Sequence, residues 1–465
     1  MSSSDTRVSV SFQTFGCRSN YADTVDLQSA LIERGFGVGE HIDGAAIHII
    51  NTCSVTDEAD REALRAIERT RRRNPEARII VTGCLAEVGS AKLSATGAVD
   101  AVVGPGRRAE LLAAITDYQA TKREVSVPRS AKAARRGGGR RQSISLDHPL
   151  SSHLPGPLSG AGDGAGRARY HLRIQEGCDN FCTFCIIPLS RGSLTSRPAA
   201  RILEDLTKLW GLGYGEIVLT GTHLGGWGED IGSSLYDLLC AIEEREFPGR
   251  IRLSSIDPND LEPRILALFA RSHTFCYHLH ICVQALTDDL LKRMNRRYRM
   301  KEVKDLLTNV RESLPECCIG ADLITGFPGE SREELDQEIQ EFLELPLSYL
   351  HVFPYSERTG TSAVHLDGSV PVAERKRRAA RWRALGERRY REFTESFVGR
   401  GVEAVFERMS DGFWVGTSRE YLPVKIGLET LADGEIRRGA MYRALTHSYD
   451  EQDGYLLCEL FDPEN

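Results

Sequence analysis

The chain has 465 residues, of which 41% are hydrophobic and 27% charged, and its formal net charge is −7. This length allows two or three domains with separate cores. The negative charge excludes a generally basic protein, so any RNA contact must be a local basic surface. The first ten residues, MSSSDTRVSV, lack the apolar core of a signal peptide, and no apolar run is long enough to span a bilayer. The chain has twelve cysteines, and because we expect a cytosolic protein, we expect the clustered ones to bind metal or do chemistry instead of forming disulfides.

Residues 6–119 alternate strand-like and helix-like segments. Strands are expected at 8–14, 46–50, 78–81 and 102–103, and helices at 23–34, 58–72 and 109–116. Such alternation predicts a parallel sheet covered by helices, that is, an N-terminal α/β domain. Residues 120–166 are rich in Gly, Pro, Ser and Arg and are expected to be a flexible linker, whose arginines are either a solvated tether or an aid in holding RNA.

Residues 167–395 repeat the β/α alternation. Strands are expected at 171–175, 216–220, 250–255, 277–283, 320–325 and 349–354, with helices between them, for example at 202–209 and 333–343. Six such units predict a partial (β/α)6 barrel, with chemistry at the carboxyl ends of its strands. The basic helical segment 374–391 is interpreted as an amphipathic connector that packs through Trp382, Leu385 and Tyr390, and an RNA-binding helix is the alternative.

Residues 396–465 show apolar residues at every second position, interrupted by turn signals. Asp411-Gly412 and Asp453-Gly454 are typical of hairpin turns between antiparallel strands. We expect a small antiparallel β-barrel, an architecture that often binds RNA.

Three cysteines, Cys178, Cys182 and Cys185, form a C-x3-C-x2-C triplet directly after the first predicted barrel strand. Three thiolates on one loop can ligate three irons of a [4Fe–4S] cube. The fourth iron then keeps the open site that a catalytic metal needs. S-adenosylmethionine (AdoMet) can chelate this iron, and an electron from the cluster can release a 5′-deoxyadenosyl radical. A zinc site or a structural cluster is the alternative, but the flanking residues offer no second C-x2-C knuckle for zinc.

A second trio, Cys17, Cys53 and Cys84, lies in the N-terminal domain, each cysteine at the carboxyl end of a predicted strand. In a parallel sheet those ends share one edge, where ligands bind. We therefore expect a second cluster, again with one open iron, here available to an exogenous sulfur. The alternative is three small cysteines packed in the core.

The six remaining cysteines show no ligand spacing. Four of them are expected in the core: Cys240, Cys276, Cys317 and Cys458. Cys282 and Cys318 lie near barrel strands and are candidates for a further role.

Motifs along nearly the whole chain resemble the methylthiotransferase family of radical AdoMet enzymes. They are TFGCRSN (14–20), NTCSVT (51–56), VTGC (81–84), GCDNFCTFCIIP (177–188), SRG (190–192), SRP (196–198), KRMNRRY (292–298), ADLITGFPGE (321–330) and PYSERTGT (354–361). The tail resembles the RNA-binding TRAM barrel that ends these enzymes. The resemblance implies that the first cluster generates the radical, which removes the hydrogen at C2 of a modified adenine. The second cluster then delivers the sulfur, and a second AdoMet methylates it.

The same resemblance places six residues around AdoMet, with barrel packing as the alternative for each of them. They are Gly215, Glu216, Ser254, Gln284, Ile324 and Gly326. One departure concerns this pocket, because the family's Gln-Ser-Gly-Ser stretch is here Gln284-Ala-Leu-Thr287. Losing the glycine puts the loop shape or the affinity for AdoMet in doubt.

Three substrates compete within the family: N6-threonylcarbamoyladenosine in tRNA, N6-isopentenyladenosine in tRNA, and an aspartate of a ribosomal protein. Residues 51–59, 174–179, 318–322 and 351–356 look most like the first branch. The expected product is the 2-methylthio derivative of that nucleoside at position 37, next to the anticodon. The expected partners are tRNA and a reducing electron donor, and no membrane. Two other interpretations are a different radical AdoMet reaction, such as a methylase or oxidoreductase, and a non-catalytic RNA-binding protein that carries clusters.

Overall fold

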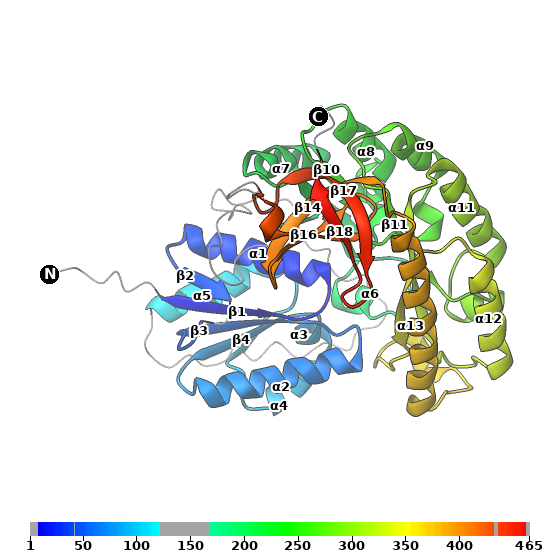
Figure 1. The fold of residues 1–465 in the computed structure, drawn as a ribbon. Coiled ribbons are helices and arrows are strands. Elements are labelled where there is room, and N and C mark those ends of the chain that lie inside the picture. Colours follow the sequence, from blue (N-terminus) through cyan, green and yellow to red (C-terminus); the bar gives the residue numbers. More distant parts are fainter. Residues whose placement is uncertain (1–7, 41, 121–167, 432–435, 462–465) are drawn as a thin grey trace. The chain divides into compact units, whose positions relative to one another are not determined.

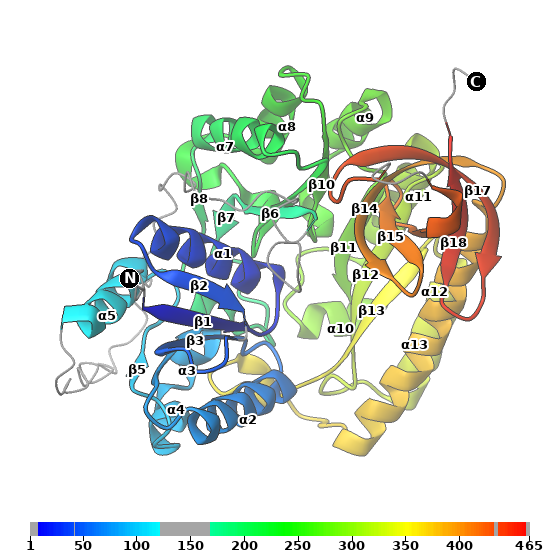
Figure 2. The ribbon, with the colours of Figure 1, turned by 60° about the vertical axis from the view of Figure 1, so that its left-hand side comes forward.

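The computed structural model describes residues 8–40, 42–120, 168–431 and 436–461 (Figures 1 and 2). The predicted linker, residues 120–166, therefore lies outside the described residues apart from its first position. Contacts divide the chain into two compact units. Of the described residues, the first unit contains 8–40, 42–120, 175–197 and 356–361, and the second contains 168–174, 198–355, 362–431 and 436–461. The predicted domain boundaries remain a prediction. The loop that carries Cys178, Cys182 and Cys185, called the radical-cluster loop from here on, belongs to the same compact unit as the N-terminal sheet.

A five-stranded parallel sheet forms the centre of the first unit, in the order β2-β1-β3-β4-β5. Its strands are β1 (Ser9–Thr14), β2 (Gly37–Glu40), β3 (Ile47–Thr52), β4 (Arg78–Gly83) and β5 (Ala101–Val102). Its helices are α1 (Arg18–Glu33), α2 (Asp57–Arg73), α3 (Cys84–Val88), α4 (Ser90–Ala95) and α5 (Arg108–Ala120). The expected strands and helices are all present, while the short strand β2 and the helices α3 and α4 were not predicted.

Buried residues on both faces explain why this sheet is covered by helices on both sides (Figure 1). Ile47 and Ile49 of β3 share one apolar cluster with Leu31 of α1 and Ile115 of α5. Ile50 joins a second cluster, with Ala63 and Ile67 of α2 and Val81 of β4. Because side chains alternate along a strand, neighbouring residues of β3 supply both cores.

The remaining elements of the first unit belong to the radical-cluster loop. They are β7 (Gln175–Glu176), α6 (Ile187–Ser190) and β8 (Thr195–Ser196), and β7 pairs antiparallel with β8. This pairing brings the two ends of the loop together.

The second unit contains six parallel strands in two three-stranded sheets, β10-β9-β6 and β11-β12-β13 (Figure 2). The strands are β6 (Tyr170–Arg173), β9 (Glu216–Thr220), β10 (Arg250–Leu253), β11 (His278–Gln284), β12 (Cys318–Thr325) and β13 (Tyr349–Pro354). Parallel bridges of Ile251 to Phe275 and of Ile256 to Ile281 link the sheets. The six predicted strands are thus present, and the expected α/β class is confirmed, but ladder pairing is not continuous between β10 and β11.

Seven helices accompany these strands in the described part of the second unit. They are α7 (Ala199–Gly211), α8 (Leu235–Glu243), α9 (Pro263–Arg271), α10 (Asp288–Arg293), α11 (Met300–Ser313), α12 (Arg332–Glu344) and α13 (Val372–Glu395). Short 3-10 turns occupy Leu224–Gly226, Glu229–Ile231, Pro258–Asp260, Ser362–His365 and Leu428–Thr430.

Helix α13 is the predicted basic segment, and it packs along β13 with Trp382 fully buried. Three of its exposed arginines are paired with carboxylates, Arg377 with Glu374, Arg381 with Asp336 and Arg388 with Glu392, and a fourth, Arg383, donates to the Val352 carbonyl. Paired charges offer little to a phosphate backbone, so we interpret α13 as the connector that its apolar residues predicted.

The predicted β-barrel at the end of the chain is closed, in the order β14-β15-β16-β18-β17, but it is not wholly antiparallel as predicted, since β16 pairs with β18 in parallel. Its strands are β14 (Gly401–Ser410), β15 (Phe413–Ser418), β16 (Pro423–Gly427), β17 (Met441–Asp450) and β18 (Tyr455–Leu460). The Asp411-Gly412 turn joins β14 to β15 with φ of 51° and 84°, the left-handed conformation that such hairpins require.

A buried ion network around Glu216 connects this barrel to β9 and β10. Glu216 accepts hydrogen bonds from Arg250 and Arg252 at 2.7 Å each, and these arginines also donate to backbone carbonyls of β14 and β15. Burial alone would raise the pKa of Glu216, but the charges of Arg252 and Arg250 outweigh it and hold the pKa well below its usual value. The carboxylate is therefore ionised and holds two buried cations.

We predict that Glu216→Gln lowers the free energy of unfolding of the second unit by about 3–5 kcal/mol, because it leaves two buried guanidinium groups without an anion. All four tryptophans, Trp210, Trp227, Trp382 and Trp414, lie in the second unit, so tryptophan fluorescence during urea unfolding reports on it.

The matched control is Glu262→Gln, which removes an exposed pair with Arg264 and is expected to cost about 0.5 kcal/mol or less. Folding lowers the pKa of Glu216. The wild type therefore gains its full extra stability over Glu216→Gln above the pKa of glutamate in the unfolded chain, about 4.3, and this extra stability shrinks as the pH falls below that value. Equal urea midpoints for Glu216→Gln and wild type would contradict this role.

Candidate metal-cluster sites

The cysteines of the second trio follow three strands of the N-terminal sheet. Cys17 caps α1 after β1, Cys53 comes directly after β3, and Cys84 begins α3 after β4. The strand order reverses between β1 and β3, and ligands of open parallel sheets bind at such a switch point, outside the carboxyl ends. The topology therefore gathers three thiols, 36 and 31 residues apart in sequence, at one edge.

The environment of these thiols fits a metal cluster. Cys17 is exposed, which does not fit core packing, whereas Cys53 and Cys84 are buried. Burial, followed by the repulsion of Cys17 and Cys84, raises the pKa of Cys53 to about 12. Burial also raises the pKa of Cys84, against the opposing effect of Arg191. Metal binding requires thiolates, so strongly bound iron would have to replace these protons.

Two glycines keep the space next to Cys17, Cys53 and Cys84 free of side chains. Gly16 and Gly83 both adopt φ of 92°, a region that residues with a side chain rarely occupy. A methyl group at Gly16 would lie 2.2 Å from Cβ and 2.6 Å from Sγ of Cys53. At Gly83 it would lie 2.2 Å from the Thr52 carbonyl oxygen. Both glycines thus permit a close approach of backbone to the cysteines.

Hydrogen bonds between the loops fix this edge of the sheet. The buried amide of Asn51 donates to the Asn20 carbonyl at 2.7 Å and to the Thr24 hydroxyl at 3.1 Å. The Thr52 hydroxyl donates to the Thr82 carbonyl at 2.6 Å. The residues before Cys53 are therefore tied to the segments that carry Cys17 and Cys84.

The C-x3-C-x2-C triplet lies on a folded loop between β7 and α6. The N–H of Cys178 donates to the Gly192 carbonyl at 3.1 Å, and the N–H of Cys185 donates to the Cys182 carbonyl at 3.0 Å. Gly177, with φ of 74°, permits this closure, since a methyl group there would lie 2.0 Å from the Ser193 carbonyl oxygen. All three cysteines are partly exposed, as a site that admits a small molecule requires.

The two cysteine trios offer a different donor set from the other group of ligand atoms in the described residues. His280, Asp322 and His351 have ligand atoms that all lie within 4.8 Å of one another. The cysteine trios supply three thiols each, the donors that iron–sulfur clusters use.

The expected AdoMet residues fall into two groups. Ser254, Gln284, Ile324 and Gly326 lie at or just beyond the carboxyl ends of β10, β11 and β12. The hydroxyl of Ser254 is buried and has no hydrogen-bond partner among the described residues, which suits a ligand contact. Gln284 and Gly326 both have φ of 73°, so the backbone turns sharply there.

Gly215 and Glu216 require a correction. They lie at the amino end of β9, where the N–H of Gly215 donates to the Gly439 carbonyl at 2.7 Å and Glu216 holds the two arginines described above. Their position argues against contact with AdoMet. The carboxyl end of β9 is formed by Thr220, and Gly221 follows it. The sequence analysis did not consider these two residues, although their place at the end of a predicted strand could have indicated them.

The unusual Ala285-Leu286 pair is accommodated in the core. Both side chains are buried, and the N–H of Leu286 donates to Glu338 at 2.7 Å. Burial, assisted by the charge of Glu330, raises the pKa of Glu338 well above its usual value. Ala285 and Leu286 are thus part of the core, while their effect on AdoMet affinity stays a prediction.

The other cysteines are mostly packed as expected. Cys276, Cys317, Cys318 and Cys458 are buried, and Cys240 is partly buried. Cys282 differs, since its thiol donates to Asp322 at 3.6 Å.

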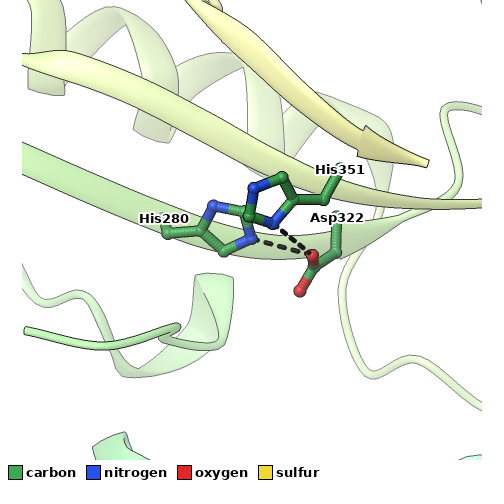
Figure 3. Close-up of side chains that lie close together, drawn as sticks. All are labelled: His280, Asp322 and His351. Carbon is green, nitrogen blue, oxygen red and sulfur yellow. Dashed lines mark ion pairs between the residues drawn. The ribbon is translucent and has the colours of Figure 1, made fainter. Parts of the chain in front are cut away.

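Asp322 belongs to a polar cluster, with His280 and His351, that sequence reasoning missed (Figure 3). Its carboxylate lies 2.8 Å from Nε2 of His280 and 3.6 Å from Nδ1 of His351. Burial would raise the pKa of Asp322, but the two histidines outweigh it and hold the pKa far below its usual value. The other nitrogen of His280 lies 2.7 Å from the Tyr349 hydroxyl, which also bonds His278. The three residues occupy adjacent strands, and only their register brings them together.

We predict that Gly16→Ala abolishes the second cluster, because the added methyl group occupies the position of Cys53. After anaerobic reconstitution, the iron content should fall from about eight to about four per chain. Gly35→Ala is the matched control, since Gly35 has φ of 83° but no atom within 4 Å of an added methyl group. It imposes similar backbone strain and should keep about eight irons. Full iron content in Gly16→Ala would contradict the site.

Two family models match parts of the chain. The model of the Uncharacterized protein family UPF0004 matches residues 9–104, and that of the Radical SAM superfamily matches residues 172–342.

Relatives match over most of their own length. The threonylcarbamoyladenosine tRNA methylthiotransferase MtaB of Bacillus subtilis is 34% identical over 89% of both chains, and that of Rickettsia prowazekii is 33% identical over 96% of both. A tRNA-2-methylthio-N(6)-dimethylallyladenosine synthase of Agrobacterium fabrum is 30% identical over 92% of this chain and 93% of its own. Among solved structures, the radical S-adenosylmethionine methyltransferase TsrM of Kitasatospora setae shares the fold, with a TM-score of 0.54 and 16% identity over 98% of this chain and 84% of its own.

Proposed function

Since the chain belongs to the methylthiotransferase family of radical AdoMet enzymes, we propose that it adds a methylthio group to C2 of N6-threonylcarbamoyladenosine at position 37 of tRNA. The observation that carries the proposal is the presence of two cysteine trios in one compact unit, one at a sheet edge and one on the C-x3-C-x2-C loop. The loop alone would serve any radical AdoMet reaction, so the second trio is the feature that argues for sulfur transfer.

The cofactors of this family are [4Fe–4S] clusters and AdoMet. We assign Cys178, Cys182 and Cys185 to the AdoMet-binding cluster, and Cys17, Cys53 and Cys84 to the second cluster. When bound, the first cluster supplies the electron that cleaves AdoMet to a 5′-deoxyadenosyl radical, and the second supplies sulfur. We place AdoMet at the strand ends of Ser254, Gln284, Ile324 and Gly326.

The residues of the chain contribute position and protection. Burial of Cys53 and Cys84 keeps water from the inner side of the second site, while the exposed Cys17 leaves one side accessible to sulfur and substrate. The partly exposed loop of Cys178 allows AdoMet to enter. The closed C-terminal barrel has the architecture of RNA-binding modules, and we assign it to tRNA.

The choice of substrate is supported by the relatives. Those named threonylcarbamoyladenosine tRNA methylthiotransferases are 33–34% identical to the chain, whereas those named for dimethylallyladenosine are 29–30% identical. N6-isopentenyladenosine in tRNA is therefore the second candidate, and the ribosomal-protein aspartate is the third.

The reaction also requires a reducing electron donor, and we place the enzyme in the cytoplasm, where thiols stay reduced. None of the helices in the described ranges is long and apolar enough to cross a membrane.

We predict that deletion of the gene removes 2-methylthio-N6-threonylcarbamoyladenosine from total tRNA and leaves its unthiolated precursor to accumulate. Mass spectrometry of digested nucleosides measures both. Wild-type chain should restore the nucleoside, whereas Cys53→Ala and Cys182→Ala should not, because each removes a ligand of one cluster. Cys458→Ala, which removes a buried thiol of the C-terminal barrel, is the control and should restore it.

The purified variants separate the two roles. With AdoMet and a reductant, Cys53→Ala should still form 5′-deoxyadenosine, and Cys182→Ala should form none. An unchanged threonylcarbamoyl nucleoside with loss of the isopentenyl counterpart would overturn the choice of substrate. No change in either nucleoside would overturn tRNA as the substrate. A wild-type protein that forms no 5′-deoxyadenosine would favour the non-catalytic RNA-binding alternative.

A further inference from the structure

Arg191 is a fully buried arginine that follows α6, six residues after the last cysteine of the triplet. Its side chain has no exposed surface, although it carries a full charge. Buried charges persist only when they are paired and hydrogen-bonded. The partners of this guanidinium group therefore show what it is placed to hold.

One arm of the guanidinium binds the start of the radical-cluster loop. The NH1 nitrogen donates to both carboxylate oxygens of Glu176, at 2.7 Å each, and Glu176 is as fully buried as the arginine. Glu176 stands two residues before Cys178. This ion pair neutralises the charge of Arg191 and ties the entry of the loop to its exit.

The other atoms of the same group reach the N-terminal sheet. The NH2 nitrogen donates to the side-chain oxygen of Asn20 and, at 3.2 Å, to Asp23, both on α1. The Nε nitrogen donates to Sγ of Cys84 at 3.4 Å. One planar cation thus bonds directly to a sulfur of the second trio while it holds the loop of the first.

A purely structural ion pair would not need the bond to sulfur. Hydrogen bonds to the ligand sulfurs and the local net charge are among the factors that set the reduction potential of an iron–sulfur cluster. A cationic donor stabilises the reduced state, which carries one more negative charge, and so raises the potential. Lysine could not replace this arginine, because the planar guanidinium group donates to several acceptors at once along fixed N–H directions, which a single ammonium group does not have.

We propose that Arg191 is a positioning residue of the second cluster, which raises the reduction potential of that cluster through its Nε–H bond to Cys84 and fixes the C-x3-C-x2-C loop beside it through Glu176. The inference rests on the proposed function in taking Cys84 as a cluster ligand. It goes further by assigning a role to a residue that ligates neither cluster.

The test is a redox titration of the reconstituted holoenzyme, followed by electron paramagnetic resonance. Addition of AdoMet perturbs the signal of the cluster that binds it and so identifies the signal of the other. Arg191→Lys keeps the charge but loses the fixed donor directions, and Arg191→Gln loses the charge. In both, the midpoint potential of the second cluster should shift to more negative values, further in Arg191→Gln, while the cluster that responds to AdoMet stays close to its wild-type potential.

Arg358→Gln is the matched control. Arg358 is also buried in the first unit, but its guanidinium group donates to Asp60 and Ser54 instead of a cysteine. Because Arg358 makes no hydrogen bond to a cysteine, this variant should shift the potential of the second cluster much less than Arg191→Gln does and should leave the AdoMet-binding cluster unchanged. Loss of only the second cluster in the Arg191 variants, with both clusters kept in Arg358→Gln, also supports the proposal, because it shows that Arg191 holds that site.

Two results would overturn the proposal. One is a second cluster whose potential in both Arg191 variants equals that of the wild type. The other is the loss of both clusters, or of the folded state, in Arg191→Lys and Arg191→Gln alike, which would show a general core role. A wild-type protein with only one cluster would instead refute the proposed function itself, so the two failures can be told apart.

Discussion

The structure depends on one geometric constraint, that all strands of a parallel sheet end at the same edge. Each cysteine of the second trio lies within three residues of the carboxyl end of a strand, so hydrogen bonding between β1, β3 and β4 brings Cys17, Cys53 and Cys84 together. The order β2-β1-β3-β4-β5 leaves the switch point between the first two of these strands. Gly16 and Gly83 precede Cys17 and Cys84. Because they have no side chain, they leave free the space that a methyl group would take from Cys53 and from the Thr52 carbonyl.

This edge creates a charge problem that buried arginines solve. Three thiolates in one place repel one another and are disfavoured by burial, as the raised pKa of Cys53 shows. Arg191 and Arg358 each bring a cation close to this edge, the first on Cys84 and the second on Ser54, next to Cys53. Arg191 lies 107 residues after Cys84 and Arg358 lies 304 residues after Ser54, yet both arginines belong to the same compact unit as the N-terminal sheet. The two cysteine trios, to which we assign radical generation and sulfur supply, thus belong to one compact unit.

Features that depend on local sequence periodicity were predictable, whereas features that depend on the direction or register of the strands were not. The strand positions follow from apolar periodicity, and the positions of the cysteines after the strands follow from the spacing, so the sheet edge was predictable. Glu216 was misplaced because proximity to a strand does not say which end of the strand carries the chemistry. The cluster of His280, Asp322 and His351 was missed because its residues come from three strands and meet only through their register. Arg191 stood in a motif, but its partners on α1 and α3 are far away in sequence.

The central claim is that one chain both cleaves AdoMet and inserts sulfur into tRNA. The most direct measurement is a reaction of the anaerobically reconstituted enzyme with AdoMet, a reductant, sulfide as the sulfur source, and tRNA that carries N6-threonylcarbamoyladenosine, with all products quantified together. The account predicts that each 2-methylthio nucleoside formed is accompanied by one 5′-deoxyadenosine, from radical generation, and one S-adenosylhomocysteine, from methylation of the sulfur. Formation of 5′-deoxyadenosine from an enzyme with both clusters, without any methylthio nucleoside, would contradict it.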